Sequence, residues 1–391
     1  MLRFIIGTAG TGKTARLREE ICRAARDGKR VLVLVPEQYS FGTERALYRA
    51  LGAAKAMGVE VLSFTRLCDL VFREYGGLAG EALEGPSRCL YMSLALSQCQ
   101  EQLRLYSGRL HGPAFLSGLV EQISEFKNAG VRPEDLRRVS EEADPGALRE
   151  KAGELALIYE TYQAYIDRGH LDPEDSLMRA CGMLEGQSFF AGAHVFLDAF
   201  KGFTAGEFRL LEQILPQAEE VWMAATADSL YDRSRGLGLF APVTETTARL
   251  ILMAREAGVA VAAPVELTEP VRFASPELSA LERGAFRAEC ESWDEIPEDI
   301  RLIPSRDPYD ELRRISGEIG RLVREKGFRY RDILVVGRGL ERYEQPIREV
   351  FENREIPFFM DRREKLSERP LAAALLCAAD AVRFRMDTDE I

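Results

Sequence analysis

The chain has 391 residues, of which 46% are hydrophobic and 29% are charged, and this length predicts two or three ordinary domains. Its formal net charge of −11 argues against a generally basic coat for nucleic acid, so any nucleic-acid binding would be a local property of one site. No apolar run predicts a membrane span, and the seven scattered cysteines predict neither disulfides nor a zinc site, so we expect a cytoplasmic protein without membrane contacts.

The first predicted elements are a buried strand at 2–6, a glycine-rich loop at 7–14 and a helix at 15–26. The loop matches the pattern G-x-x-x-x-G-K-[ST] of phosphate-binding loops, whose backbone N–H groups cradle phosphate oxygens. In such loops the lysine (here Lys13) neutralises the β- and γ-phosphates, and the following hydroxyl (here Thr14) ligates Mg²⁺. We therefore predict that ATP and Mg²⁺ bind at Gly7, Thr8, Ala9, Gly10, Thr11, Gly12, Lys13 and Thr14.

Two further strand–helix units are predicted next, from a strand at 30–35, a helix at 43–51 and a strand at 59–64. The apolar residues of these strands are continuous rather than alternating, which is typical of strands covered on both faces in a parallel sheet. A doubly wound domain of this kind binds its ligands at the carboxyl ends of its strands.

Residues 85–186 show only helical periodicity and no convincing strand. Proline followed by acidic residues occurs at 133–135 and again at 173–175. We interpret both as helix starts rather than as metal ligands, because proline and carboxylates are favoured in the first helical turn.

The sheet is predicted to resume at 193–198, 220–225 and 259–263. The proline-containing segment 264–308 is interpreted as a connector with a covering segment. A second alternation then begins, with strands at 301–303, 332–337 and 356–359 and helices at 310–326, 343–353 and from 371. Because three strands are few for a domain, we expect the chain to be a fragment of a longer polypeptide.

Asp198, at the end of a predicted strand, is the best candidate for the acid that holds Mg²⁺ together with Thr14. In hydrolases a glutamate often follows this acid to orient the attacking water, but here the next residue is Ala199. Glu207 is expected to be occupied as the third residue of a helix capped by Thr204. The nucleotide-binding half of the site is thus predicted to be intact and the hydrolysing half to be damaged.

Aromatic, amide and arginine side chains follow three predicted strands, at 37–41, 63–66 and 200–204. Aromatic rings stack on bases while arginines and hydroxyls hold phosphates, which suits single-stranded nucleic acid. The alternative is that Phe64 and Phe200 are simply core residues.

The runs GTAGTGKT, VLVLVPEQYSFGTERAL and VEVLSFTRLCDLVFREYGG closely resemble the amino-terminal part of AddB, and VFLDAFKGFTAGEFRLLEQIL and YRDILVVGRGLERYEQPIREVFENREIPFFMD continue the match. AddB is the partner subunit of the bacterial AddAB (RexAB) helicase–nuclease, and the chain is also similar to UvrD-type helicases. The resemblance implies an α/β fold with a RecA-like P-loop domain at 1–84 and 187–270. It further implies an all-helical insertion at 85–186, a connector at 271–300 and the incomplete start of a second RecA-like α/β domain at 301–391.

By the same resemblance, Arg338 lies where helicases keep an arginine that reaches the γ-phosphate. The residues implied to contact DNA are Gln38, Ser40, Phe64, Arg66, Phe200 and Phe203. In AddB this surface is implicated in recognising the Chi sequence. The implied partners are an AddA-type helicase–nuclease subunit, single-stranded DNA and broken double-stranded DNA, in the resection of double-strand breaks and recombinational repair.

Ala199 departs from the helicase pattern, so a motor-inactive module that binds ATP and DNA is the first hypothesis. The nuclease domain and the four cysteines of an iron–sulfur cluster would belong only to the missing carboxyl-terminal part of the parent protein. Two alternatives remain: a stand-alone P-loop kinase or phosphotransferase with a helical lid, and a scaffold whose ATP site stabilises the fold.

Overall fold

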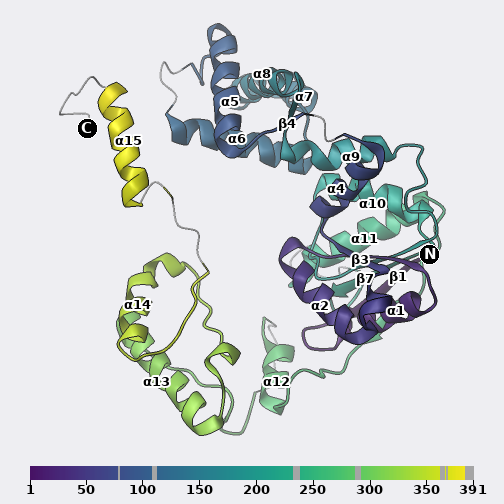
Figure 1. Cartoon of the computed structure of the whole chain (residues 1–391), viewed down its shortest axis with the longest axis vertical. Helices are drawn as coiled ribbons and strands as arrows, with labels where there is room; N and C mark the ends of the chain where they lie inside the picture. Colours follow the sequence, from purple (N-terminus) through teal and green to yellow (C-terminus); the bar gives the residue numbers. More distant parts are fainter. Residues whose placement is uncertain are drawn as a thin grey trace. The chain divides into compact units, whose positions relative to one another are not determined.

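The computed structural model describes residues 1–77, 80–107, 112–231, 238–286, 292–361, 366 and 369–383. They belong to two compact units, Met1–Asp294 and Glu295–Ile391, which Figure 1 draws in purple to green and in green to yellow.

The first unit is built on a six-stranded parallel sheet with the order β3-β2-β6-β7-β1-β8. The predicted mixed α/β architecture with a parallel sheet is therefore confirmed. The strands are β1 (Leu2–Gly7), β2 (Arg30–Leu34), β3 (Val59–Leu62), β6 (Ala193–Leu197), β7 (Glu220–Thr226) and β8 (Val265–Leu267).

Helices cover both faces of this sheet because its strands are apolar on both sides. Successive side chains of a strand point to opposite faces, so Val31 and Val33 of β2 join one buried cluster while Leu32 and Leu34 join another. The first cluster includes residues of α1 (Lys13–Arg26) and α2 (Ser40–Leu51). The second includes residues of α4 (Phe64–Tyr75), α9 (Ser176–Leu184), α10 (Ala205–Gln217) and α11 (Ala241–Glu256).

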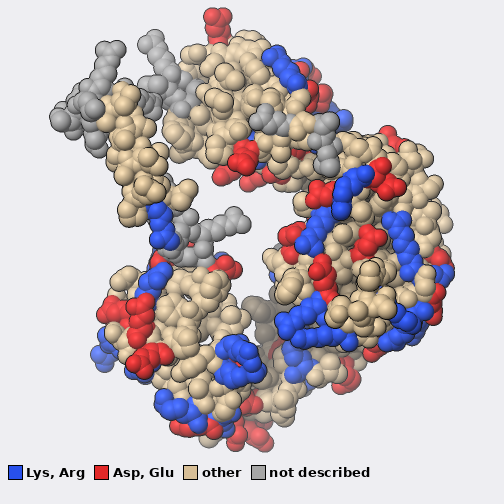
Figure 2. All heavy atoms as spheres, in the orientation of Figure 1, with Lys and Arg blue, Asp and Glu red and all other residues tan. Residues whose placement is uncertain are grey.

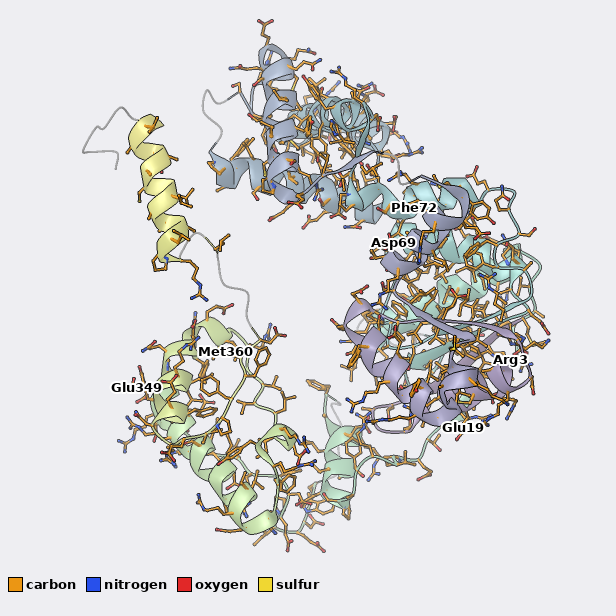
Figure 3. The ribbon with its side chains drawn as sticks, in the orientation of Figure 1. Arg3, Glu19, Asp69, Phe72, Glu349 and Met360 are labelled. Carbon is orange, nitrogen blue, oxygen red and sulfur yellow. The ribbon has the colours of Figure 1, made fainter. Side chains whose placement is uncertain are left out.

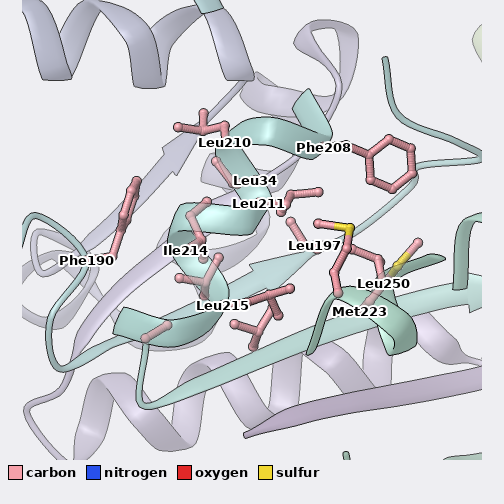
Figure 4. Packing of buried hydrophobic residues seen from close by; sticks show 14 of the residues in the cluster. Leu34, Phe190, Leu197, Phe208, Leu210, Leu211, Ile214, Leu215, Met223 and Leu250 are labelled. Carbon is pink, nitrogen blue, oxygen red and sulfur yellow. The ribbon is translucent and has the colours of Figure 1, made fainter. Parts of the chain in front are cut away.

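Figure 4 shows the second cluster from close by, with apolar residues of α10 packed beside strand residues such as Leu197 and Met223. Figure 3 labels two residues of α4 that show how such a helix is oriented: Phe72 is buried in the cluster, whereas Asp69 is exposed. This amphipathic pattern fixes the buried side of each covering helix.

The segment between α4 and β6 forms α5 (Gly85–Cys99), α6 (Pro113–Ala129), α7 (Pro133–Glu142) and α8 (Ala147–Ile166), followed by α9. α5, α6 and α8 share an apolar cluster of their own that includes the fully buried ring of Tyr162. The predicted helix starts are confirmed: the Asp135 carboxylate accepts from the Arg132 N–H at 2.9 Å, and Asp172 accepts from the Glu174 N–H at 3.1 Å.

Three local predictions are wrong. His170–Leu171 pairs with Glu81–Ala82 as a two-residue parallel ladder, β5 with β4, in the segment expected to lack strands. Phe64 begins α4 rather than ending β3, because the Ser63 hydroxyl caps that helix by accepting from the Arg66 N–H at 3.2 Å. Residues 259–263 make only an isolated bridge between Val261 and Leu2, and β8 forms after Pro264 instead.

In the second unit, α13 (Pro308–Lys326) and α14 (Glu344–Glu352) enclose a small apolar cluster, and α15 (Pro370–Arg383) follows. The strands predicted at 301–303, 332–337 and 356–359 are wrong within the described residues, which contain no ladder in this unit. A strand needs a neighbour for its backbone groups, and an apolar run alone does not supply one. Leu302 and Leu334 accordingly stay 96% and 84% exposed.

Among the described residues, none of the helices combines the length and the apolar character that crossing a membrane requires.

A nearly buried charge network ties α6 to residues 172–175. The Lys127 ammonium lies 2.8 Å from an oxygen of Asp172 and 2.8 Å from an oxygen of Asp175, and Arg88 adds a second cation 3.4 Å from Asp172. The Lys127 and Asp172 side chains are only 4% and 0% exposed, so water cannot replace a lost partner.

We expect Lys127→Ala to lower the free energy of unfolding by about 3 kcal/mol, because it leaves the buried Asp172 carboxylate, with Asp175 beside it, without their shared cation. Urea denaturation of the full chain measures this effect. Arg137→Ala is the control, since it breaks an exposed ion pair with Glu160 and such pairs contribute about 0–1 kcal/mol. Equal effects of the two substitutions would contradict a structural role for the network.

Candidate functional site

The loop at 7–12 joins β1 to α1, and its three glycines are required by its geometry. Gly10 and Gly12 have φ of 80° and 87°, in the left-handed region that glycine adopts without strain. Gly7 is required for space: a Cβ there would lie 2.4 Å from the Thr11 hydroxyl and 2.5 Å from the Leu267 carbonyl oxygen. The predicted strand at 2–6 and helix at 15–26 are both confirmed around this loop.

Lys13, at the first position of α1, folds back over the loop. Its ammonium donates to the Thr8 carbonyl oxygen at 2.7 Å, and the Thr11 hydroxyl donates to the same oxygen at 3.0 Å. Burial lowers the pKa of Lys13 and the nearby Arg272 lowers it further, while Asp198 and Glu282 act in the opposite direction. Two cations, Lys13 and Arg272, and two carboxylates, Asp198 and Glu282, therefore lie close enough to interact at this loop.

Asp198 follows β6, two strands away from β1 in the sheet, and reaches the start of α1. Its Oδ1 accepts from the Thr14 hydroxyl at 3.4 Å and from the Ala199 N–H at 2.9 Å. Burial raises the pKa of Asp198, and these hydrogen bonds and Lys13 partly counteract it. The structure therefore brings Lys13, Thr14 and Asp198 together, a set whose two oxygen donors suit Mg²⁺.

Glu207 is occupied at the start of α10, as expected. Its carboxylate accepts from the Thr204 N–H at 2.7 Å, and the Thr204 hydroxyl accepts from the Glu207 N–H at 3.3 Å. This reciprocal capping box is confirmed, and it commits the carboxylate to a structural task.

Part of the segment predicted to be a connector covers the loop. The N–H groups of Val271 and Arg272 donate to the Gly10 carbonyl oxygen at 2.9 and 3.0 Å. The Phe273 ring lies so close to Gly10 that a Cβ there would be 2.9 Å from it. Sequence reasoning missed Arg272 as a cation of this site.

Glu282 was missed as well. It lies on α12 (Pro276–Gly284), and its Oε1 accepts a hydrogen bond from the Ala9 N–H at 3.1 Å. The local signal was available, because Ser275 before Pro276 is a typical helix cap, and its hydroxyl does accept from the Leu278 N–H at 3.3 Å. The signal identifies a helix but not the surface that the helix covers.

A cavity of about 590 Å³ lies beside the first loop residues, Gly7 and Thr8. Its lining includes three carboxylates, those of Asp228, Glu266 and Glu282.

The predicted DNA-contacting residues near β2 and β3 differ in accessibility. Gln38 is exposed, and Arg66 is half-exposed and pairs with Glu44 at 3.0 Å and with Glu37 at 3.6 Å. Ser40, by contrast, is buried at the start of α2. In the view of Figure 2, lysine and arginine side chains gather over α1 and α2, so the negative net charge of the chain is unevenly distributed.

The predicted aromatic residues form one cluster. The Phe64 ring is buried and meets the rings of Phe200 and Phe203 edge-on, with centroids 5.5 and 5.9 Å apart. Phe200 and Phe203 are only partly buried and keep some ring surface accessible. Arg338 is an exposed residue of the second unit, and its predicted role stays a prediction.

A family profile described as "ADDB, N-terminal" matches residues 4–282. The chain belongs to the AddB family. Curated relatives, each named as one subunit of an ATP-dependent helicase/deoxyribonuclease, include those of Desulforudis audaxviator, 36% identical over 100% of this chain, and Symbiobacterium thermophilum, 35% identical over 97%. The relative from Acetivibrio thermocellus is 34% identical over 97%. This AddB-family chain spans 34% of the length of each of these three relatives.

The close approach at Gly7 predicts the effect of one methyl group. We expect Gly7→Ala to lower the free energy of unfolding by about 1–3 kcal/mol, because the Leu267 carbonyl cannot retreat without moving β8. Gly42→Ala is the matched control: no atom lies within 4 Å of its Cβ position in α2, so it should stabilise the helix by about 0.5–1 kcal/mol. Chemical denaturation distinguishes the two, and a neutral Gly7→Ala would contradict the geometry.

Proposed function

We propose that the chain is the nucleotide- and DNA-binding part of a helicase–nuclease subunit that acts in the processing of broken DNA ends. The sheet with its loop after β1 would be a RecA-like P-loop domain, and α5–α9 its helical insertion. The observation that carries the nucleotide half of this proposal is the convergence of Lys13, Thr14 and Asp198 on one glycine-built loop.

The loop would bind ATP by its backbone N–H groups and by the positive end of α1. Lys13 would leave the Thr8 carbonyl and contact the β- and γ-phosphates, since an ammonium bonds a phosphate anion more strongly than a neutral carbonyl. Thr14 and Asp198 would hold Mg²⁺, which supplies charge neutralisation for the phosphates when bound. Arg272 would be a second cation for the phosphates, because it already lies close enough to Lys13 to lower that lysine's pKa.

ATP hydrolysis is proposed to be weak. The residue after Asp198 is Ala199, whose side chain cannot accept a proton. The Glu207 carboxylate is already engaged in its capping box with Thr204. The chain would therefore bind the nucleotide as a ligand more than hydrolyse it as a substrate.

Single-stranded DNA is proposed to bind at the ends of β2, β3 and β6. Gln38 and Arg66 offer polar contacts there, and the partly accessible rings of Phe200 and Phe203 offer stacking surface. Phe64 and Ser40 are buried, so they would hold these groups in place rather than contact the DNA themselves. Recognition of a Chi sequence in the parent protein belongs to the same proposal.

The parent protein would work with an AddA-type subunit, since the relatives are named as one subunit of a helicase/deoxyribonuclease. The same names weigh against a stand-alone kinase or phosphotransferase.

Lys13→Ala tests the nucleotide site. We expect it to weaken binding of ATP with Mg²⁺ by about a hundredfold, because a charge-assisted contact to phosphate is lost from a partly buried site. Isothermal titration calorimetry measures this change. Lys29→Ala removes a lysine that pairs with Glu219 and lies just before β2, and it should leave ATP affinity unchanged. Unaltered binding by Lys13→Ala would remove the phosphate-loop assignment.

Arg66→Ala tests the DNA surface. It should weaken binding of a labelled single-stranded oligonucleotide and reduce the salt dependence by about one released counterion, while ATP affinity stays the same. Arg73→Ala, at the exposed end of the same helix α4, is the control. If Arg66→Ala changed ATP affinity alone, the surface would be wrongly assigned.

A further inference from the structure

We infer that Glu282 is an internal anion that occupies the phosphate loop and must be expelled when a nucleotide enters. This inference rests on the proposed nucleotide binding and adds to it a means by which the nucleotide controls α12. The contact joins residues 273 positions apart, with the Glu282 Oε1 3.1 Å from the Ala9 nitrogen.

Because of the chemistry of the loop, the Glu282 carboxylate would compete with a phosphate for the same N–H group. Backbone N–H groups of a loop before a helix favour negative charge, and a carboxylate satisfies them much as a phosphate oxygen does. Glu282 also lies close enough to Lys13 to raise its pKa, against the effect of Arg272. A negative group therefore already stands among the groups proposed to hold phosphates.

Two of the contacts that hold the cover over the loop differ in kind. Val271 and Arg272 are held by backbone hydrogen bonds to Gly10, which do not depend on charge. Glu282, in the last turn of α12, adds a hydrogen bond that depends on its negative charge. An entering phosphate repels Glu282 and leaves the backbone anchor intact, so α12 would be released at its carboxyl-terminal end.

The release would act at the carboxyl-terminal end of α12. α12 ends at Gly284 and is the last helix among the described residues of the first unit. Loss of the Glu282 contact would therefore free the last turn of α12. The nucleotide would act as a switch on this turn without being hydrolysed.

Glu282→Ala tests the inference in the full chain. Without nucleotide, hydrogen exchange at the α12 amides should become faster, because the helix loses its contact with the loop. With ATP and Mg²⁺, the affinity should rise roughly threefold to tenfold, because no internal anion has to be displaced. In the unsubstituted chain, addition of ATP should speed exchange at the same amides.

Glu266→Ala is the matched control. Glu266 carries the same charge into the same cavity, but within the described ranges it has no hydrogen bond to the loop. An equal gain in ATP affinity in both variants would overturn the inference, because charge removal alone would explain it. Unchanged α12 exchange in Glu282→Ala would overturn it as well. Absence of ATP binding in every variant would instead overturn the proposed function, while the exchange experiment without nucleotide would still report on the contact.

Discussion

The close packing of three segments of the chain at Gly7 is the constraint on which the site depends. β1 ends there, the loop turns back there through Thr11, and the carbonyl of Leu267 at the end of β8 approaches the same point. Because glycine has no Cβ, all three fit, and β8 can lie directly beside the loop. The residues after β8 are then carried over the loop, which brings Arg272 and Glu282 to it. The absence of a Cβ at Gly7 thus allows β8 and the residues after it to contact the loop.

The parallel sheet determines the rest of the site. Strands buried on both faces cannot shift without exposing apolar side chains, so the carboxyl ends of β1 and β6 keep a fixed spacing. That spacing allows Asp198 to contact Thr14 although 184 positions separate them. Burial raises the pKa of Asp198, so a cation bound beside it would stabilise its charged form.

The sequence predicts this structure well where the signal is local. The apolar runs of β1, β2, β6 and β7, the glycine loop, and the capping box of Thr204 and Glu207 each depend on residues close together in the chain. The failed strands at 301–303 and 332–337 have the same apolar composition, but strand formation also depends on a partner that composition does not specify. Glu282 was missed for the related reason that its contact with Ala9 joins distant positions, and only the path of the chain after β8 creates it.

Binding and hydrolysis of a triphosphate place different demands on a chain, which is why the proposed function separates the two. The cradle is made mainly of backbone N–H groups and glycine geometry, so it survives most side-chain changes outside the loop. Hydrolysis requires a carboxylate at one position, and Ala199, with φ of 64°, cannot provide it. A ligand that binds only the folded state stabilises it in proportion to the logarithm of its concentration over its Kd. A nucleotide in this loop would therefore contribute stability, and through Glu282 would influence α12, with no turnover required.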